Sequence, residues 1–179
     1  SVHEGFPHAI ALSQQGYNAF VLQYRVGGEQ VACEDLAAAL SYIFQNAETL
    51  EVSTENYSVW GSSAGARMAA RVGSYGAVEY GGDEIPRPST VIMAYTGHSD
   101  YTQSDPPTFA VVGDRDGIAS PSTMERRVNA MRSAGIDVEL HVYPNVGHGF
   151  GLGLGTNAEG WLEDAVRFWE NHMSASSSR

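Results

Sequence analysis

Short apolar runs recur along the chain, and amphipathic stretches separate most of them. Each run holds four to six residues, is rich in strand-forming side chains, and is bounded by Gly, Pro or polar positions, which is typical of buried strands in a parallel sheet. Five strands are therefore predicted, at residues 19–24, 57–60, 91–95, 109–112 and 138–143. The last of them alternates apolar and polar positions, which predicts a half-exposed strand at the edge of the sheet.

The stretches between these runs carry helical periodicity. A first helix is predicted over residues 7–15, with Pro7 at its first position and Gly16 just past its end. A second is predicted over residues 31–47, because four apolar side chains fall on one of its faces: Leu36, Leu40, Ile43 and Phe44.

Three further helices follow later in the chain. One starts directly after the strand at 57–60 and fades by residues 73–76. Ser120 and Pro121 open the next as N-cap and first helical residue; Gly135 ends it, and its expected buried face is formed by Met124, Val128 and Met131. A capping box over residues 156–159 announces the last, whose apolar stripe is formed by Leu162, Ala165, Val166 and Trp169.

A helix thus follows each predicted strand except the one at 91–95, where a loop intervenes. This alternation predicts an α/β fold, a mostly parallel sheet flanked by helices. Residues 1–173 are expected to form a single domain, and the Ser-rich residues 174–179 a disordered tail.

Composition and charge exclude several classes of binding partner. The chain has 179 residues, and its net charge of -11 comes without any basic cluster, so neither nucleic acid nor an anionic membrane is an expected partner. No apolar run is long enough to span a bilayer. Cys33 is the single cysteine, which excludes an intrachain disulfide and suits a small core residue. The scattered histidines lack metal-ligand spacing, so neither a metal nor another cofactor is expected.

The segment Gly61–Gly65 fits the pattern G-x-S-x-G, with Ser63 at its centre. A serine on a sharp turn from strand to helix is forced into strained backbone angles, and small neighbours let the chain reverse around it. The turn lifts the hydroxyl clear of the sheet and directs the first N–H groups of the helix, Ala64 among them, at an oxygen that develops charge.

Two more reactive side chains follow other strand ends. Asp116 lies past the strand at 109–112 and His148 past the strand at 138–143, so in a parallel sheet both meet Ser63 at one edge. Imidazole takes the proton of an attacking hydroxyl near neutral pH, and a carboxylate on the other ring nitrogen orients it. Asp114 and Asp105 compete with Asp116 for that role, although either suits a turn or cap.

Each of these residues also has a plainer interpretation. Ser63 could be a small residue that a tight turn requires, and His148 could be an ordinary loop histidine. Among the other histidines only His98 is retained as a possible pocket residue. Trp161 and Trp169 are candidates to line a sugar or aromatic site, with core packing the favoured role for Trp169.

Four stretches carry a resemblance to the α/β-hydrolase superfamily, closest to its acetylesterase-like and carbohydrate-esterase-like branch related to hormone-sensitive lipase. They are residues 24–26, 61–65, 106–117 and 148–152. The resemblance implies a serine carboxylesterase acting on small-molecule esters, such as acetyl or feruloyl groups on plant polysaccharide. It makes Ser63 the nucleophile, His148 the base and acid, and Asp116 the orienting carboxylate.

The chain also departs from that family. The family carries a glycine-rich oxyanion segment after an early strand; none precedes residue 19, and Gly27 and Gly28 follow the wrong strand to replace it. The N–H of Ala64 supplies one oxyanion donor, so a second is missing. The family's first strands are absent too, including the one that lies between the counterparts of 19–24 and 57–60. These departures predict a fragment of a longer enzyme.

Two other functions remain open at this level. A serine peptidase of the prolyl-oligopeptidase kind shares the same triad. A catalytically impaired hydrolase fold that serves as a binding module would explain the missing oxyanion segment.

Overall fold

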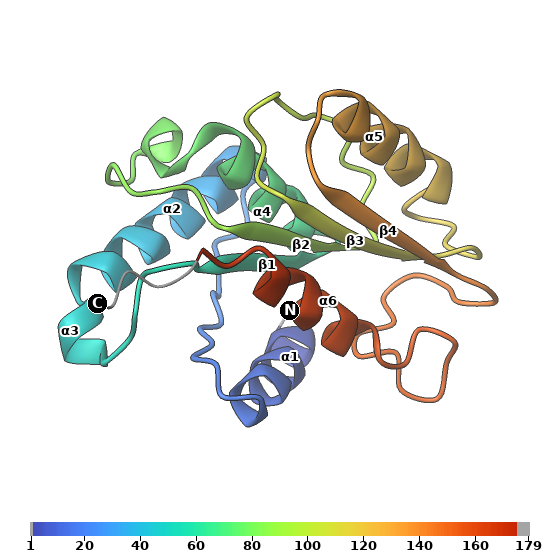
Figure 1. Ribbon diagram of the computed structural model, residues 1–179, viewed down its shortest axis with the longest axis horizontal. Coiled ribbons are helices and arrows are strands. Elements are labelled where there is room, and N and C mark those ends of the chain that lie inside the picture. Colours follow the sequence, from blue (N-terminus) through green and yellow to red (C-terminus); the bar gives the residue numbers. More distant parts are fainter. Residues whose placement is uncertain (1, 175–179) are drawn as a thin grey trace.

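A computed structural model describes residues 2–174 and contains one parallel sheet of four strands (Figure 1). The order is β1-β2-β3-β4, and every neighbouring pair is parallel. The strands are β1 (Ser58–Ser62), β2 (Thr90–Ala94), β3 (Thr108–Gly113) and β4 (Val138–Tyr143). The two central strands are buried throughout, whereas β4 is half-exposed at one edge, as its alternation predicts.

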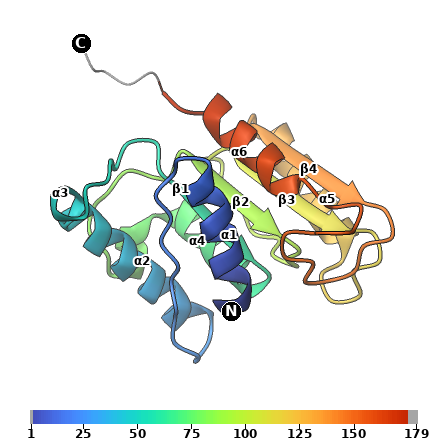
Figure 2. The same cartoon turned by 90° about the horizontal axis from the view of Figure 1, so that it is seen from below.

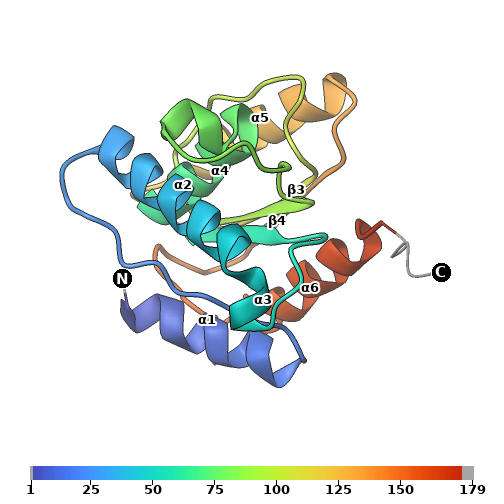
Figure 3. The same ribbon diagram turned by 90° about the vertical axis from the view of Figure 1, so that its left-hand side faces the viewer.

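Helices cover both faces of this sheet, which confirms the predicted α/β class. One layer contains α2 (Glu29–Gln45), α4 (Ala64–Tyr75) and α5 (Pro121–Ser133); the other contains α1 (Val2–Gln14) and α6 (Trp161–Asn171) (Figures 1 and 3). Figure 2 shows α1 and α6 side by side across the second face. Two short turns complete the set, α3 (Ala47–Leu50) and η1 (Ala77–Tyr80).

The first of the five predicted strands, at residues 19–24, is wrong. Residues 17–25 run without strand pairing between α1 and α2, and the side chain of Phe20 is 52% exposed. The segment has strand-forming residues but no neighbouring strand at hydrogen-bonding distance, because a groove separates it from β1. A strand exists only where a second strand pairs with it, which local sequence does not reveal.

Two helix starts also differ from the prediction. Helix α1 begins at Val2, so Pro7 lies inside it and removes only one hydrogen bond near its N-terminal end. The capping box does not form. Thr156 donates to the carbonyl of Gly153 and accepts from the N–H of Ala158, and α6 begins only after Gly160, whose φ of 90° ends the turn.

The predicted buried faces of α5 and α6 are confirmed, apart from Trp169, which is only partly buried. Cys33 is fully buried, as predicted. On α2 the core face consists mainly of small residues such as Ala32, Cys33 and Ala37. Of the predicted stripe on that helix only Leu40 is buried, and its other three members remain partly exposed at the groove.

The expected tail from residue 174 lies almost wholly outside the described residues, which end there. None of the helices in residues 2–174 combines the length and apolar character that a bilayer crossing requires.

Candidate active site

The site is built on the turn between β1 and α4. Ser63 joins the two elements with φ of 53° and ψ of -115°, a strained conformation for a residue other than glycine. Its N–H donates to the carbonyl of Ala94 at 2.8 Å, which ties the turn to β2. A Cβ on Gly61 would lie 2.1 Å from the carbonyl oxygen of Gly65, so only glycine lets strand and helix approach this closely.

The strand ends bring Ser63, His148 and Asp116 together. The Ser63 Oγ lies 3.3 Å from the His148 Nε2, and the His148 Nδ1 lies 2.8 Å from the Asp116 Oδ2. The Asp116 side chain is fully buried, while a fifth of the His148 side chain is exposed. The other carboxylate oxygen of Asp116 accepts the N–H groups of Ile118 and Ala119 at 2.9 and 2.7 Å, which holds the carboxylate in place.

The two competing aspartates have other partners. Asp114 accepts the N–H of Asn145 at 2.7 Å and so fixes the turn after β4. Asp105 forms a buried ion pair with Arg127 of α5, with 3.2 Å between Oδ2 and Nη2. Neither contacts His148 in the described structure, so Asp116 is the carboxylate that the fold presents to the imidazole.

Tyr95 is a site residue that the sequence did not single out. It follows β2 with φ of 37°, and its ring packs edge-on against the imidazole of His148, with 4.9 Å between centroids. Its hydroxyl donates to Glu4 of α1 at 2.6 Å and accepts the N–H of Gly151 at 3.4 Å. Burial, and then the hydrogen bond to Glu4, raise the pKa of the Tyr95 phenol. The one feature of the sequence that could have identified Tyr95 is its position, as a bulky residue at the end of a predicted strand on the same edge of the sheet.

Trp161 fixes the far side of the His148 loop. Its indole N–H donates to the carbonyl of Gly151 at 2.8 Å, and the ring of His8 packs edge-on against it. Burial lowers the pKa of His8. Both tryptophans that the sequence suggests for a sugar site line the groove beside β1. Trp161 is buried there. Trp169 is only partly buried, and its indole N–H donates to the carbonyl of Asn56.

Ala64 is the first residue of α4 and is exposed next to Ser63. The first N–H groups of a helix have no acceptor within it, so this one is free for a substrate oxygen. Gly28 is the N-cap of α2 with φ of 107°, so the Gly27–Gly28 pair starts a helix rather than forming an oxyanion segment.

His98 is not a pocket residue, which corrects the sequence-based expectation. Only 2% of it is exposed, and it lines neither described cavity. Burial, with the positive charge of Arg127 next in importance, lowers the pKa of His98 to about 4. The residue therefore belongs to the packed loop beneath α5 and not to the site.

Comparison with known proteins assigns the chain to a family. The family model described as prolyl oligopeptidase family matches residues 72–176, and the BD-FAE model matches residues 3–91. The chain belongs to the prolyl oligopeptidase family of α/β-hydrolases. The match spans Asp116 and His148 as well as β2, β3 and β4, while the BD-FAE match spans the turn at Ser63.

Solved structures support the same superfamily. MGS-M1, an α/β-hydrolase from a Medee basin deep-sea metagenome library, is 27% identical with a TM-score of 0.81, over 96% of this chain and 78% of that one. An acetyl ester-xyloside bifunctional hydrolase from Caldicellulosiruptor lactoaceticus is 22% identical with a TM-score of 0.81, over 96% of this chain and 77% of its own.

Among curated proteins, an acetylxylan esterase from Xylanibacter ruminicola is 20% identical over 86% of this chain. This chain spans only 38% of the length of that relative. The hydrolase family is therefore established for the chain, together with its α/β-hydrolase fold.

Proposed function

We propose that this chain is a serine carboxylesterase that acts through an acyl-enzyme. The observation that carries the proposal is the continuous contact from the Ser63 hydroxyl through His148 to the buried Asp116. The His148 imidazole takes the Ser63 proton as Oγ attacks the acyl carbon, and returns it to the departing alcohol. Water, activated by the same imidazole, then hydrolyses the acyl-enzyme and restores Ser63.

Asp116 keeps the imidazole in the tautomer that accepts a proton at Nε2. Two backbone N–H groups bind its other oxygen, so the carboxylate is held in orientation without a further side chain. The N–H of Ala64 stabilises the oxyanion. Loss of one such donor lowers turnover by about 10²- to 10³-fold, so with Ala64 alone we expect slow but measurable hydrolysis.

For the substrate we propose small acyl esters, with acetyl or feruloyl groups on carbohydrates as the natural class. The similarity to an acetylxylan esterase and to an acetyl ester-xyloside hydrolase supports this class. A related thermophilic esterase from Thermogutta terrifontis, 20% identical with a TM-score of 0.80, has been solved with propionate bound, which supports a short acyl group.

The test is turnover of p-nitrophenyl acetate by the chain and by Ser63→Ala. The matched control is Ser122→Ala, since Ser122 is an exposed serine in the first turn of α5. We expect turnover in the wild type and the control and none above background in Ser63→Ala. Equal turnover in Ser63→Ala would refute the mechanism, and no turnover in any variant would favour a binding module instead.

A covalent label tests the nucleophile separately. The same Thermogutta esterase has been solved phosphorylated by paraoxon. Paraoxon should place one diethylphosphoryl group on the Ser63 oxygen with release of p-nitrophenolate, detected by peptide mass spectrometry. Labelling of another serine, or equal labelling of Ser63→Ala, would remove Ser63 from its role.

A peptidase is the second candidate, and the match to the prolyl oligopeptidase family favours it. Esters and amides differ in the leaving group, so paired substrates separate the two functions. We expect acetyl xylan and p-nitrophenyl acetate to be cleaved and a prolyl p-nitroanilide to be left intact. Preferential cleavage of the anilide would assign the chain to peptide hydrolysis.

A further inference from the structure

His148 lies in a segment whose own backbone does little to fix it. Between β4 and α6 the described backbone of residues 144–160 forms neither helix nor strand, and glycine stands at positions 147, 149, 151, 153 and 155. Gly149 and Gly151 have φ of 74° and 56°, a region that glycine populates about as readily as negative φ. A base on such a segment keeps its place only if other elements hold the backbone on both sides of it.

The side before the imidazole is held by backbone atoms. The N–H of Arg115 donates to the carbonyl of Val146 at 3.0 Å, and Val146 is buried. A Cβ on Gly113 would lie 2.0 Å from that carbonyl oxygen, so the segment lies directly against the end of β3. Because the hydrogen bond joins two backbone groups, it needs no particular side chain.

The side after the imidazole is held by side chains from two other elements. Phe150 packs edge-on against Tyr95 and Trp161, with ring centroids 4.8 and 6.3 Å apart. Both backbone groups of Gly151 are also bonded. Its N–H donates to the Tyr95 hydroxyl at 3.4 Å, and its carbonyl accepts the indole N–H of Trp161 at 2.8 Å.

Of these two hydrogen bonds, the one from Trp161 is the stronger constraint. A distance of 2.8 Å between donor and acceptor is usual for N–H···O, whereas the 3.4 Å to the Tyr95 hydroxyl is long. Trp161 is 2% exposed and is the first residue of α6, so the donor belongs to a buried, rigid element. Removal of that donor would free the Gly151 backbone from α6.

We propose that Trp161 is a positioning residue for the reaction at Ser63. Its indole N–H fixes Gly151, three residues past His148, and so keeps the imidazole Nε2 within reach of the Ser63 hydroxyl. That distance of 3.3 Å is at the long end of hydrogen-bond distances, so a small outward movement of the segment breaks the contact. The inference rests on the proposed function, in which this imidazole is the general base.

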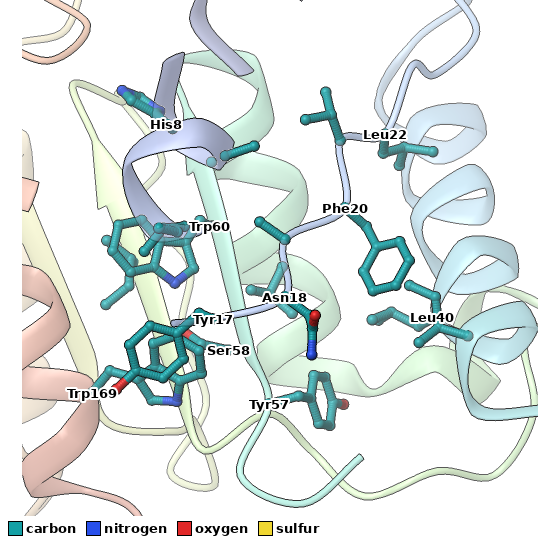
Figure 4. Close-up of a pocket in the computed structure, with 18 of the residues that line it drawn as sticks. His8, Tyr17, Asn18, Phe20, Leu22, Leu40, Tyr57, Ser58, Trp60 and Trp169 are labelled. Atoms are coloured by element: carbon teal, nitrogen blue, oxygen red, sulfur yellow. The ribbon is translucent and has the colours of Figure 1, made fainter. Parts of the chain in front are cut away.

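Trp169 provides a matched control on the same helix. Its indole N–H donates to the carbonyl of Asn56 at 2.7 Å, a hydrogen bond of the same kind as that of Trp161. Asn56 precedes β1, so this bond lies at the edge of the sheet opposite to the strand ends that hold the reacting groups. Figure 4 shows Trp169 beside Tyr17, at the other end of the pocket from His8, whose ring packs against Trp161.

The sharpest perturbation changes one atom of the indole. The amino acid 3-benzothienylalanine has the shape of tryptophan with sulfur in place of the N–H, and stop-codon suppression places it at Trp161 or at Trp169 of the whole chain. Turnover of p-nitrophenyl acetate is then measured. At Trp161 we expect kcat to fall about tenfold and KM to change less than about twofold, because the base and not the acyl group is displaced. At Trp169 kcat should change less than about twofold.

Natural residues repeat the comparison. Trp161→Phe and Trp169→Phe each remove one indole N–H, and urea unfolding shows that each variant is folded at the assay temperature. We expect the same difference in kcat between them. A role in stability alone would lower the urea midpoint without separating the two variants in kcat, and that result would overturn the proposal.

The mobility of the imidazole is measured without a substrate. Histidine labelled with ¹³C at Cε1 gives an NMR order parameter for each ring, and His148→Gln identifies the signal of His148. With 3-benzothienylalanine at Trp161 we expect this order parameter to fall from about 0.85 to below about 0.6, and with it at Trp169 to stay unchanged.

Failure of this inference and failure of the proposed function give different results. If Ser63→Ala keeps full turnover, the proposed function is wrong. If Ser63→Ala is inactive but the benzothienylalanine variants have equal kcat, the esterase function stands and Trp161 has no positioning role. If the wild-type chain shows no turnover, the order parameter of His148 decides, and an equal value in both variants overturns the proposal.

Discussion

Replacing glycine by alanine should have opposite effects on stability at Gly61 and at Gly65, which lie four residues apart. At Gly61 an alanine Cβ would lie 2.1 Å from the carbonyl oxygen of Gly65, whereas Cβ atoms keep at least 3.0 Å from such neighbours. The obstructing atoms belong to the backbone of α4 and cannot rotate away. Strand and helix must therefore separate, and the turn that carries Ser63 must deform.

The expected effect of Gly61→Ala follows from that displacement. Overpacking a well-packed interior costs about 1–3 kcal/mol, and a rigid backbone contact places this variant near about 3 kcal/mol. For a domain of this size that corresponds to a fall in Tm of about 6–12 °C. If Ser63 acts as proposed, its displacement by about 1 Å should lower turnover by about 10²-fold.

Gly65→Ala provides the matched control. A Cβ at this position has no atom within 4 Å, and the residue lies in the first turn of α4. Alanine is favoured over glycine in a helix by about 0.5–1 kcal/mol, so this variant should be slightly more stable than the wild type. Urea unfolding followed by tryptophan fluorescence measures both changes. Wild-type stability in Gly61→Ala, or a shift of both variants in the same direction, would refute the steric argument.

Three further predictions address the site and its surroundings. Asp116→Asn should lower turnover of p-nitrophenyl acetate by about 10⁴-fold, because the amide favours the wrong tautomer of the imidazole. Asp114→Asn alters only a turn and should change turnover in the same assay less than tenfold. Tyr95→Phe keeps the ring against His148 and should retain most of the kcat. Tyr95→Leu removes the ring, and its kcat should be at least about tenfold lower than that of Tyr95→Phe. An equal loss of kcat in both variants would contradict a positioning role for the ring. Below its ordinary pKa of 6.5, His98 binds a proton in the unfolded chain but not in the fold, where its pKa is about 4. Between pH 6.5 and pH 4 the wild type should therefore lose about 3 kcal/mol of unfolding free energy more than His98→Gln, as measured by urea titration at each pH.

The sequence carried most of the information about the proposed reacting groups, because strand ends in a parallel sheet gather at one edge. Ser63, Asp116 and His148 each follow a separate apolar run, and the structure brings all three into contact. Position along the chain favours Asp116 over Asp114, because Asp116 lies further past the strand end, but both follow β3 closely. The structure separates them: one oxygen of Asp116 contacts the His148 Nδ1 and the other accepts two backbone N–H groups, whereas Asp114 accepts the N–H of Asn145.

Other features depend on long-range pairing that local sequence does not encode. Residues 19–24 have the composition of a strand, but in the described structure no strand lies beside them. Tyr95 looks like the end of a buried strand, and its contacts with Glu4 and His148 come from elements 91 and 53 positions away. Thr156 and Glu159 have capping-box spacing, yet the chain turns twice more before α6 begins.

The four strands lie in the sheet in the same order as along the chain, and this has a consequence for folding during synthesis on the ribosome. Ser63 leaves the ribosome with the first strand, but the imidazole it contacts arrives only after the fourth has emerged. A nascent or prematurely terminated chain that stops before residue 148 holds the Ser63 hydroxyl without the imidazole that contacts it. Under the proposed mechanism, ester cleavage starts only after β4 has docked, so the time at which turnover appears during refolding would report completion of the sheet.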